Sequence, residues 1–289
     1  MATTAILSAS NLDISKVTFG EIRMNKAGGK TVPIKYNGQN LQFRIPKMMY
    51  PMGVNVKETD NGTNYQLSAT MKGCDSYAKE RAGTEVGEIG ILYNFLIDLQ
   101  EKLLQTSIAN SAKWFGKVRS KEVLSDSMKL VLSPSVELLN GEWVPTGKYP
   151  PSLRMKVPVY NGEVSMDVID ASGKPVEVTT DNLTSIFKKR VEASVIVSPS
   201  VYVSGQGFGI TWRVTHARVC PPARLTAAQA FADELEEEVA ETAPTASAAV
   251  EEEEEQHQEE VSVPVSEPTP TAPVAVPAKN RRRAVGGAL

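Results

Sequence analysis

Four Asn-Gly dipeptides interrupt segments in which apolar and polar residues alternate. They are Asn37-Gly38, Asn61-Gly62, Asn140-Gly141 and Asn161-Gly162. Both residue types tolerate the positive φ angles of a type I′ turn, so this dipeptide between alternating runs predicts a β-hairpin. We therefore expect antiparallel strands in the following segments: Val32–Tyr36, Leu41–Ile45, Asn64–Met71, Leu153–Val159, Glu163–Ile169, Glu192–Ser204 and Phe208–Val219.

One long helix is expected between these strands. Apolar residues recur at three- and four-residue spacing from Val86 to Leu103, which gives one apolar face. Thr84 is a candidate cap, and Glu85 and Glu88 suit the positive end of the helix dipole. Shorter helices are expected over Ser120–Ser127, Leu183–Arg190 and Ala227–Thr242. Many strands with one long helix, in no repeating order, favour a mainly β fold, a barrel or sandwich with helical insertions.

The charge of the chain is distributed unevenly. Thr226–Leu289 holds 14 acidic and 4 basic residues, whereas Met1–Arg224 holds 27 basic and 20 acidic residues. This asymmetry suggests a polyanionic partner, although such a body charge is also ordinary for a protein surface. The acidic segment is rich in Pro, Thr and Glu and poor in bulky side chains, which is typical of disorder. We expect a folded domain at 1–225 and a disordered tail at 226–289.

The composition also limits the compartment. No apolar run is long enough for a membrane-spanning helix, and Met1–Ile14 lacks the pattern of a secretory signal. Without a secretory context, Cys74 and Cys220 are expected to be reduced thiols in an intracellular protein.

Residues for catalysis are scarce, and we expect no enzyme, cofactor or metal. The body has one histidine, His216, on an expected strand, where a solvent-facing or hydrogen-bonded role is the commoner one. The Cys and His residues are too few for a zinc site. Gly28–Thr31 resembles the end of a phosphate-binding loop, but Met24 occupies the position of the required glycine. We interpret this segment as a loop between strands.

Aromatic residues are interleaved with basic ones, a pattern that suits single-stranded nucleic acid because bases stack on rings while Lys and Arg follow the phosphates. The segment from Trp114 to Lys121 shows it most strongly, although Trp114 could equally anchor the helix to the barrel. The candidate contacts are Arg44, Lys47, Tyr50, Lys72, Tyr77, Lys79, Arg81, Trp114, Lys117, Arg119 and Lys121.

The acidic tail gains a role beside such a surface. A tethered polyanion reaches a local concentration on the order of millimolar and would compete with nucleic acid for the basic surface. Once displaced, it could recruit basic partner proteins. The alternative is a tail that only improves solubility.

Seven segments of the body form a recognisable set: Gly28–Ile34, Tyr36–Gly38, Leu41–Met48, Pro51–Gly53, Trp114–Lys117, Tyr149–Lys156 and Gly207–Trp212. Through these segments the sequence resembles, over Gly20–Val219, proteins of large nucleocytoplasmic DNA viruses of algae and protists, some of which are related to T7-type single-stranded DNA-binding proteins. The resemblance implies an OB-like β-barrel, single-stranded DNA binding and an acidic tail that contacts replication proteins, such as a viral DNA polymerase or helicase-primase.

The end of the chain departs from that family. T7-type tails end acidic with an aromatic residue, whereas this chain carries Arg281–Arg283 close to its end. This difference weakens the docking role of the tail, and the basic cluster could instead be a nuclear import signal or a second electrostatic contact.

Taken together, the sequence predicts a non-enzymatic single-stranded DNA-binding protein of viral DNA replication or recombination. It would work in the host nucleus or a viral factory, and packaging in the virion and a homodimer both stay open. The alternative is a structural virion protein of the minor capsid type built on a β-sandwich, which does not explain the basic-aromatic pattern.

Overall fold

The computed structural model describes residues 6–24, 28–59 and 62–220, all of which belong to the unit Met1–Leu225. The expected disorder of 226–289, the expected helix Ala227–Thr242 and the cluster Arg281–Arg283 lie outside the described residues.

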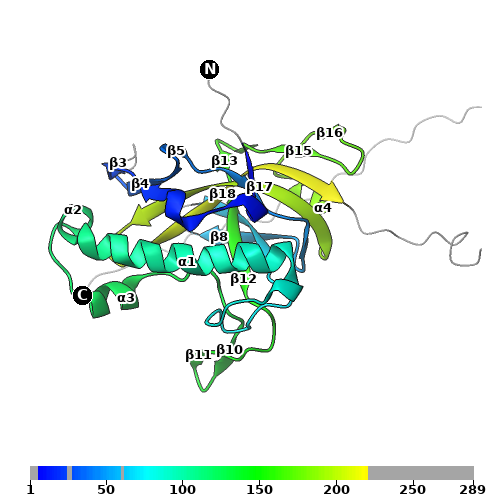
Figure 1. The fold of residues 1–289 in the computed structure, drawn as a ribbon. Coiled ribbons are helices and arrows are strands. Elements are labelled where there is room, and N and C mark those ends of the chain that lie inside the picture. Colours follow the sequence, from blue (N-terminus) through cyan, green and yellow to red (C-terminus); the bar gives the residue numbers. More distant parts are fainter. Residues whose placement is uncertain (1–5, 25–27, 60–61, 221–289) are drawn as a thin grey trace, which may run out of the picture. The chain divides into compact units, whose positions relative to one another are not determined.

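Strand β17 (Val191–Val203) and strand β18 (Phe208–Cys220) form the long hairpin around which the main sheet is built (Figure 1). On the edge that faces away from β18, β17 pairs in turn with β4, β6 and β7. On the edge that faces away from β17, β18 pairs in parallel with β12 and β15. Beyond β12 the order continues through β9 to β8. Because β7 lies against β9, the sheet curls back on itself. The other strands named here are β4 (Lys30–Tyr36), β6 (Phe43–Arg44), β7 (Met48–Tyr50), β8 (Val54–Thr59), β9 (Gly62–Thr70), β12 (Ser152–Val157) and β15 (Asp167–Ile169).

Short strands extend or flank this sheet. They are β1 (Leu7–Ser8), β2 (Val17–Phe19), β3 (Arg23–Met24), β5 (Gln39–Asn40) and β16 (Pro175–Val176). Two small hairpins stand apart from it, β10 (Val136–Leu139) with β11 (Glu142–Pro145) and β13 (Val159–Tyr160) with β14 (Glu163–Val164).

The Asn-Gly turns are confirmed where they are described. Asn37, Asn140 and Asn161 each have φ near 50°, and the glycine after each has φ between 82° and 86°, as a type I′ turn requires. Asn61, in the remaining dipeptide, lies outside the described residues. Several expected strands are shorter or broken. Pro158 separates β12 from β13, because proline has no N–H to donate to a strand ladder.

The long helix is confirmed as α1 (Glu88–Ala109), but Thr84 does not cap it. Residues Thr84–Val86 form a 3-10 turn, and the chain enters α1 through Gly87, whose φ of 66° suits glycine. The short helix α2 (Ser111–Phe115) follows and ends at Gly116 in the left-handed conformation. Helix α4 (Leu183–Ile186) is shorter than expected, since Arg190 has a positive φ and β17 begins at Val191. Two further 3-10 turns cover Ala9–Asn11 and Ile14–Lys16.

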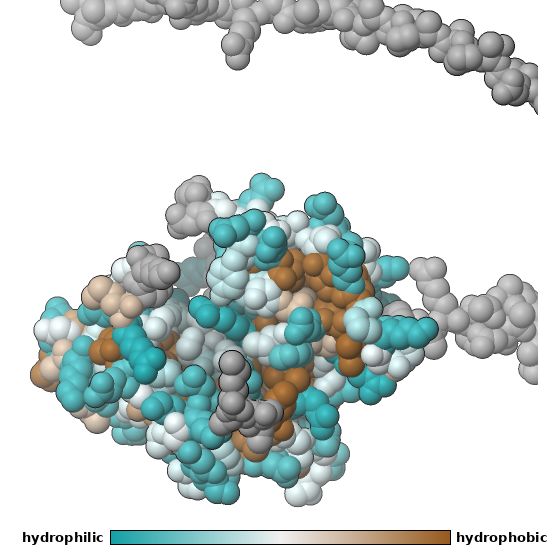
Figure 2. Space-filling view, turned by 90° about the horizontal axis from the view of Figure 1, so that it is seen from above, coloured by the Kyte–Doolittle hydropathy of each residue, from teal (hydrophilic) through white to brown (hydrophobic). Residues whose placement is uncertain are grey.

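The core lies between the concave side of the sheet and α1. Leu92, Leu96, Leu99 and Leu103 of α1 are buried together with alternate residues of the strands. The surface seen from above carries many hydrophilic side chains, with a large hydrophobic area among them and smaller hydrophobic spots to its left (Figure 2). Cys74 and Cys220 are free thiols, and burial raises the pKa of Cys74 to about 11. The fold class is confirmed: mainly β, an OB-like curled sheet with one long inserted helix.

No helix among the described residues is both long enough and apolar enough to cross a membrane.

Helix α3 (Lys121–Ser127) begins where the sequence predicts, because the Ser120 hydroxyl accepts a hydrogen bond from the Val123 N–H. We expect Ser120→Ala to lower the free energy of unfolding by about 1 kcal/mol, the usual cost of losing an N-cap. Urea unfolding followed by circular dichroism measures this change. Ser120→Asp, which keeps an acceptor at the cap, should restore the stability, and an equal loss in both variants would contradict the capping role.

Candidate nucleic-acid interface

Four cations stand together on the outer face of the sheet. The register aligns Arg213 of β18 with Lys156 of β12, and Lys156 with Gln66 of β9. Cross-strand partners lie on the same face of a sheet, as do residues two apart on one strand. Arg154 is two residues from Lys156 on β12, and Lys57 of β8 pairs with Asn64, which is two residues from Gln66 on β9, so both share this face. We call these four residues, Lys57, Arg154, Lys156 and Arg213, the cationic strip.

None of the described cross-strand partners of these four residues is acidic. The side chains paired with them are Ser68, Gln66, Asn64 and Ser198, all polar and uncharged. All four cations are exposed, and none forms an ion pair within the described part of the chain. Strands are about 4.8 Å apart, so the strip crosses about 14 Å of sheet from β18 to β8. An extended polyanion can lie across such a surface.

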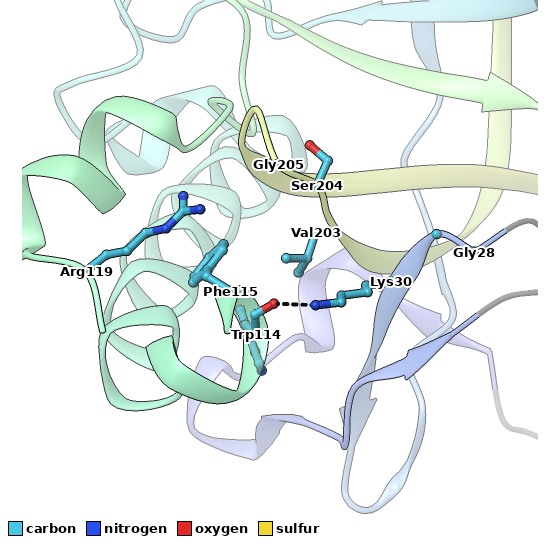
Figure 3. A pocket seen from close by; sticks show the side chains of 9 residues that line it. Gly28, Lys30, Trp114, Phe115, Arg119, Val203, Ser204 and Gly205 are labelled. Carbon is cyan, nitrogen blue, oxygen red and sulfur yellow. Dashed lines mark hydrogen bonds between the residues drawn. The ribbon is translucent and has the colours of Figure 1, made fainter. Parts of the chain in front are cut away.

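A cavity of about 410 Å³ lies at the tip of the β17–β18 hairpin (Figure 3). It is formed by three segments that are far apart in the sequence. Its walls are Gly28, Gly29, Lys30, Trp114, Phe115, Arg119, Val203, Ser204 and Gly205. This volume falls in the range of small-ligand pockets and suits one nucleotide better than a base pair.

The chemistry of the cavity combines a ring with two cations. The guanidinium of Arg119 lies 4.6 Å from the centroid of the Phe115 ring. The Lys30 ammonium donates a hydrogen bond of 3.5 Å to the carbonyl of Trp114. Arg119 Nε is buried without a hydrogen-bond partner among the described residues.

Ser111 fixes the loop that supplies Arg119. Its hydroxyl accepts the Arg119 N–H at 2.9 Å and donates to the Lys117 carbonyl at 3.3 Å. Ser111 is buried, so these two hydrogen bonds hold the loop against the end of α1. The cavity and the strip are linked by β17, whose last residue, Val203, lines the cavity while Ser198 lies beside Arg213, about 17 Å back along the strand.

The structure places the sequence-predicted contacts in several different environments. Arg119 lines the cavity, and Lys117 and Lys121 are exposed two residues to either side of it. Arg44 lies on the outer face of the sheet beside Ile196. Lys72 is exposed just after β9. Lys47 and Arg81 are paired with Glu192 and Asp98, so their charges are already partly neutralised.

Two predicted aromatic contacts require correction, because their rings are buried. Tyr50 points into the core from β7, and this burial raises the pKa of its hydroxyl. Trp114 is 3% exposed and packs edge-on against Phe19 and Phe115, so it anchors α2 to the barrel, the alternative left open above. Neither ring is accessible to a base. Phe115, the next residue, is partly exposed and lines the cavity together with Trp114.

The cationic strip is not among the contacts predicted from the sequence. The alternation along β12 does place Arg154 and Lys156 on the face opposite to that of the buried Leu153 and Met155. What the sequence lacks is the register that brings Arg213 and Lys57 next to them.

His216 has the environment of a surface histidine. Its Nδ1 lies 3.0 Å from the Thr215 hydroxyl, and its Nε2 lies 3.5 Å from Asp167. The Thr215 hydroxyl donates to the Ile196 carbonyl. With its proton engaged there, this hydroxyl is not activated as a nucleophile.

Comparison with solved structures finds similar proteins among phages. The chain is similar to gp2.5, a single-stranded DNA-binding protein encoded by bacteriophage T7, with 12% identity and a TM-score of 0.39, covering 72% of this chain and 99% of gp2.5. It is also similar to the single-stranded DNA-binding protein of bacteriophage Enc34 in complex with ssDNA, with 10% identity and a TM-score of 0.38, covering 72% of this chain and 97% of that one. No protein-family model and no curated protein matches the sequence.

Proposed function

We propose that this protein binds single-stranded DNA with little sequence preference and without catalysis. The observation that carries the proposal is the cationic strip, four unpaired cations on one exposed sheet face that leads along β17 to the cavity. Lys and Arg are suited to phosphates, while the Phe115 ring and the Arg119 guanidinium offer flat surfaces to a base. Single-stranded DNA is also the ligand named for the phage proteins described above.

The strand would lie across the strip and place one nucleotide in the cavity. A single strand fits better than a duplex, because stacking on Phe115 needs an unpaired base. We further propose a role in viral DNA replication or recombination, in a host nucleus or viral factory, in keeping with the family resemblance of the sequence. The acidic tail at 226–289 would compete with DNA for the strip and contact replication proteins.

The first test is a titration of fluorescently labelled oligo-dT, followed by anisotropy at several salt concentrations. Six cations, the strip with Lys30 and Arg119, predict a slope of about −4 in log K against log salt. The affinity should then fall by about two orders of magnitude between roughly 50 mM and 200 mM salt. No binding at low salt would contradict the proposal.

The role of the tail needs a second protein in the same assay. A chain ending at Arg224 retains the strip and the cavity but lacks the acidic segment. Competition by the tail predicts tighter binding by the shortened chain at low salt. Equal affinity of the two chains would reject the competition without affecting the binding proposal.

A further inference from the structure

The hairpin formed by β10 and β11 projects away from the body below α1 (Figure 1). It pairs with no other strand of the described chain. Its register places Leu138 opposite Trp143 and Val136 opposite Pro145. Side chains alternate between faces, so these four share one face, and all four are exposed. The hairpin thus presents an apolar face with nothing packed on it in the described structure.

Trp143 is the most unusual residue of that face. Its side chain is 69% exposed, whereas Trp114 and Trp212, the other tryptophans of the chain, are 3% and 2% exposed. An exposed tryptophan is costly in water unless a partner covers it, and exposed apolar surface of this kind marks an interaction site.

Two more exposed rings lie at the foot of the hairpin, each with an ammonium group near it. Lys79 Nζ lies 5.9 Å from the Tyr77 ring centroid, and Lys148 Nζ lies 5.7 Å from that of Tyr149. Tyr77 is 43% exposed and Tyr149 is 61% exposed. Rings accompanied by cations are the elements with which proteins hold single strands.

The loop that carries Tyr77 and Lys79 is preformed. The Asp75 carboxylate accepts the backbone N–H groups of Lys79, Glu80 and Tyr77, and these hydrogen bonds lower the pKa of Asp75. Tyr77 in turn lies against Gly147, just beyond β11, where any added side chain would collide with the ring. The foot of the hairpin and the Tyr77 loop are therefore held together.

The foot of the hairpin is continuous with the cationic strip. Ser133, before β10, bridges to Ser152, the first residue of β12. Arg154 follows two residues later on the outer face, a distance of about 7 Å along the strand. A strand that crosses the strip toward Arg154 would thus reach Tyr149 and the hairpin next.

We propose that the β10–β11 hairpin is a stacking arm, on which Trp143 stacks against the bases of single-stranded DNA that leaves the cationic strip. The inference rests on the proposed function and adds a site to it. Glu137 is paired with Lys148 at 2.8 Å, so both charges are partly neutralised, and Lys79 beside Tyr77 is the cation at the foot of the arm that forms no ion pair among the described residues. The competing occupant of an apolar arm is a second copy of the chain, which the test below distinguishes.

The test uses full-length protein, oligo-dT and the variants Trp143→Phe and Trp143→Ala. Because the other two tryptophans are buried, oligo-dT should quench the intrinsic fluorescence of the wild type mainly through Trp143. Trp143→Phe keeps a ring for stacking and should keep the affinity while losing most of the quenching. Trp143→Ala should bind between about 5-fold and 150-fold more weakly, the range for one lost base-aromatic stack. Tyr160→Ala, which removes an exposed ring elsewhere, should bind like the wild type.

Each remaining outcome overturns the stacking arm. Equal affinity of Trp143→Ala and the wild type would reject the arm while single-stranded DNA binding stands. A change from dimer to monomer in Trp143→Ala, measured by light scattering, with unchanged DNA affinity would assign the face to a second copy. No binding by the wild type would reject both the arm and the proposed function.

Discussion

The variant Arg154→Gln/Lys156→Gln/Arg213→Gln is expected to bind oligo-dT roughly 100-fold more weakly than the wild type at low salt. Each exposed cation contributes about 1 kcal/mol when it meets a phosphate, and three such losses multiply. The salt slope should also become shallower by about 2, since each lost contact removes about 0.7. Anisotropy titrations over a salt series give both quantities from one set of measurements.

A matched variant distinguishes the effect of the strip on DNA affinity from the effect of the net charge. Lys174→Gln/Lys188→Gln/Lys189→Gln removes the same number of charges from exposed positions outside the strip. It should bind within a few fold of the wild type, because an exposed charge that meets no phosphate releases no counterions on binding. If both triple variants lose the same affinity, the protein attracts DNA through its overall charge, and the strip is not a site.

Local chemistry explains which parts of the fold could be predicted from the sequence. The Asn37-Gly38, Asn140-Gly141 and Asn161-Gly162 turns form as expected, because few dipeptides adopt two successive positive φ angles without strain. The apolar face of α1 follows from spacing within one helix. The start of α1 was misplaced because Gly87 could not be recognised as the entry residue, with Thr84 and Glu85 resembling a cap nearby.

The candidate site depends on pairing between distant segments, which a single sequence does not contain. Lys57, Lys156 and Arg213 come from strands separated by many residues, and only the register of β8, β9, β12 and β18 aligns them. Basic residues close to aromatic ones in the sequence include Lys117 and Arg119 of the cavity loop, but they do not include Arg154 and Lys156, which have no aromatic residue beside them.

Proximity to basic residues in the sequence does not distinguish a buried ring from an exposed one. Trp114 and Trp143 both occur in mixed, partly polar segments. Trp114 becomes buried because α2 packs against Phe19, whereas Trp143 stays exposed because no further described strand pairs with its hairpin. Both outcomes are decided by tertiary packing, and the sequence offered only the chain order.

Phe43 is the residue at which three distant parts of the fold meet. Its ring packs edge-on against Phe95 of α1, with ring centroids 6.1 Å apart, and against Trp212 of β18, at 6.0 Å. Phe43 itself belongs to β6 and is fully buried. Helix and sheet are therefore joined through this side chain, and the cationic strip lies on the opposite face of the sheet that it supports.

We expect Phe43→Ala to lower the free energy of unfolding by about 3–5 kcal/mol, because it leaves a cavity and removes two aromatic contacts. For a domain of this size the melting temperature should fall by about 6–20 °C. Urea unfolding and thermal melts followed by circular dichroism measure both. Phe43→Leu, which keeps part of the volume, should lose less than Phe43→Ala, and Tyr160→Ala at an exposed ring should change the stability by less than about 0.5 kcal/mol. Removing a fully buried ring that packs between two others must lower the free energy of unfolding. If Phe43→Ala lowers it no more than Tyr160→Ala does, α1 is not held to the sheet through this contact.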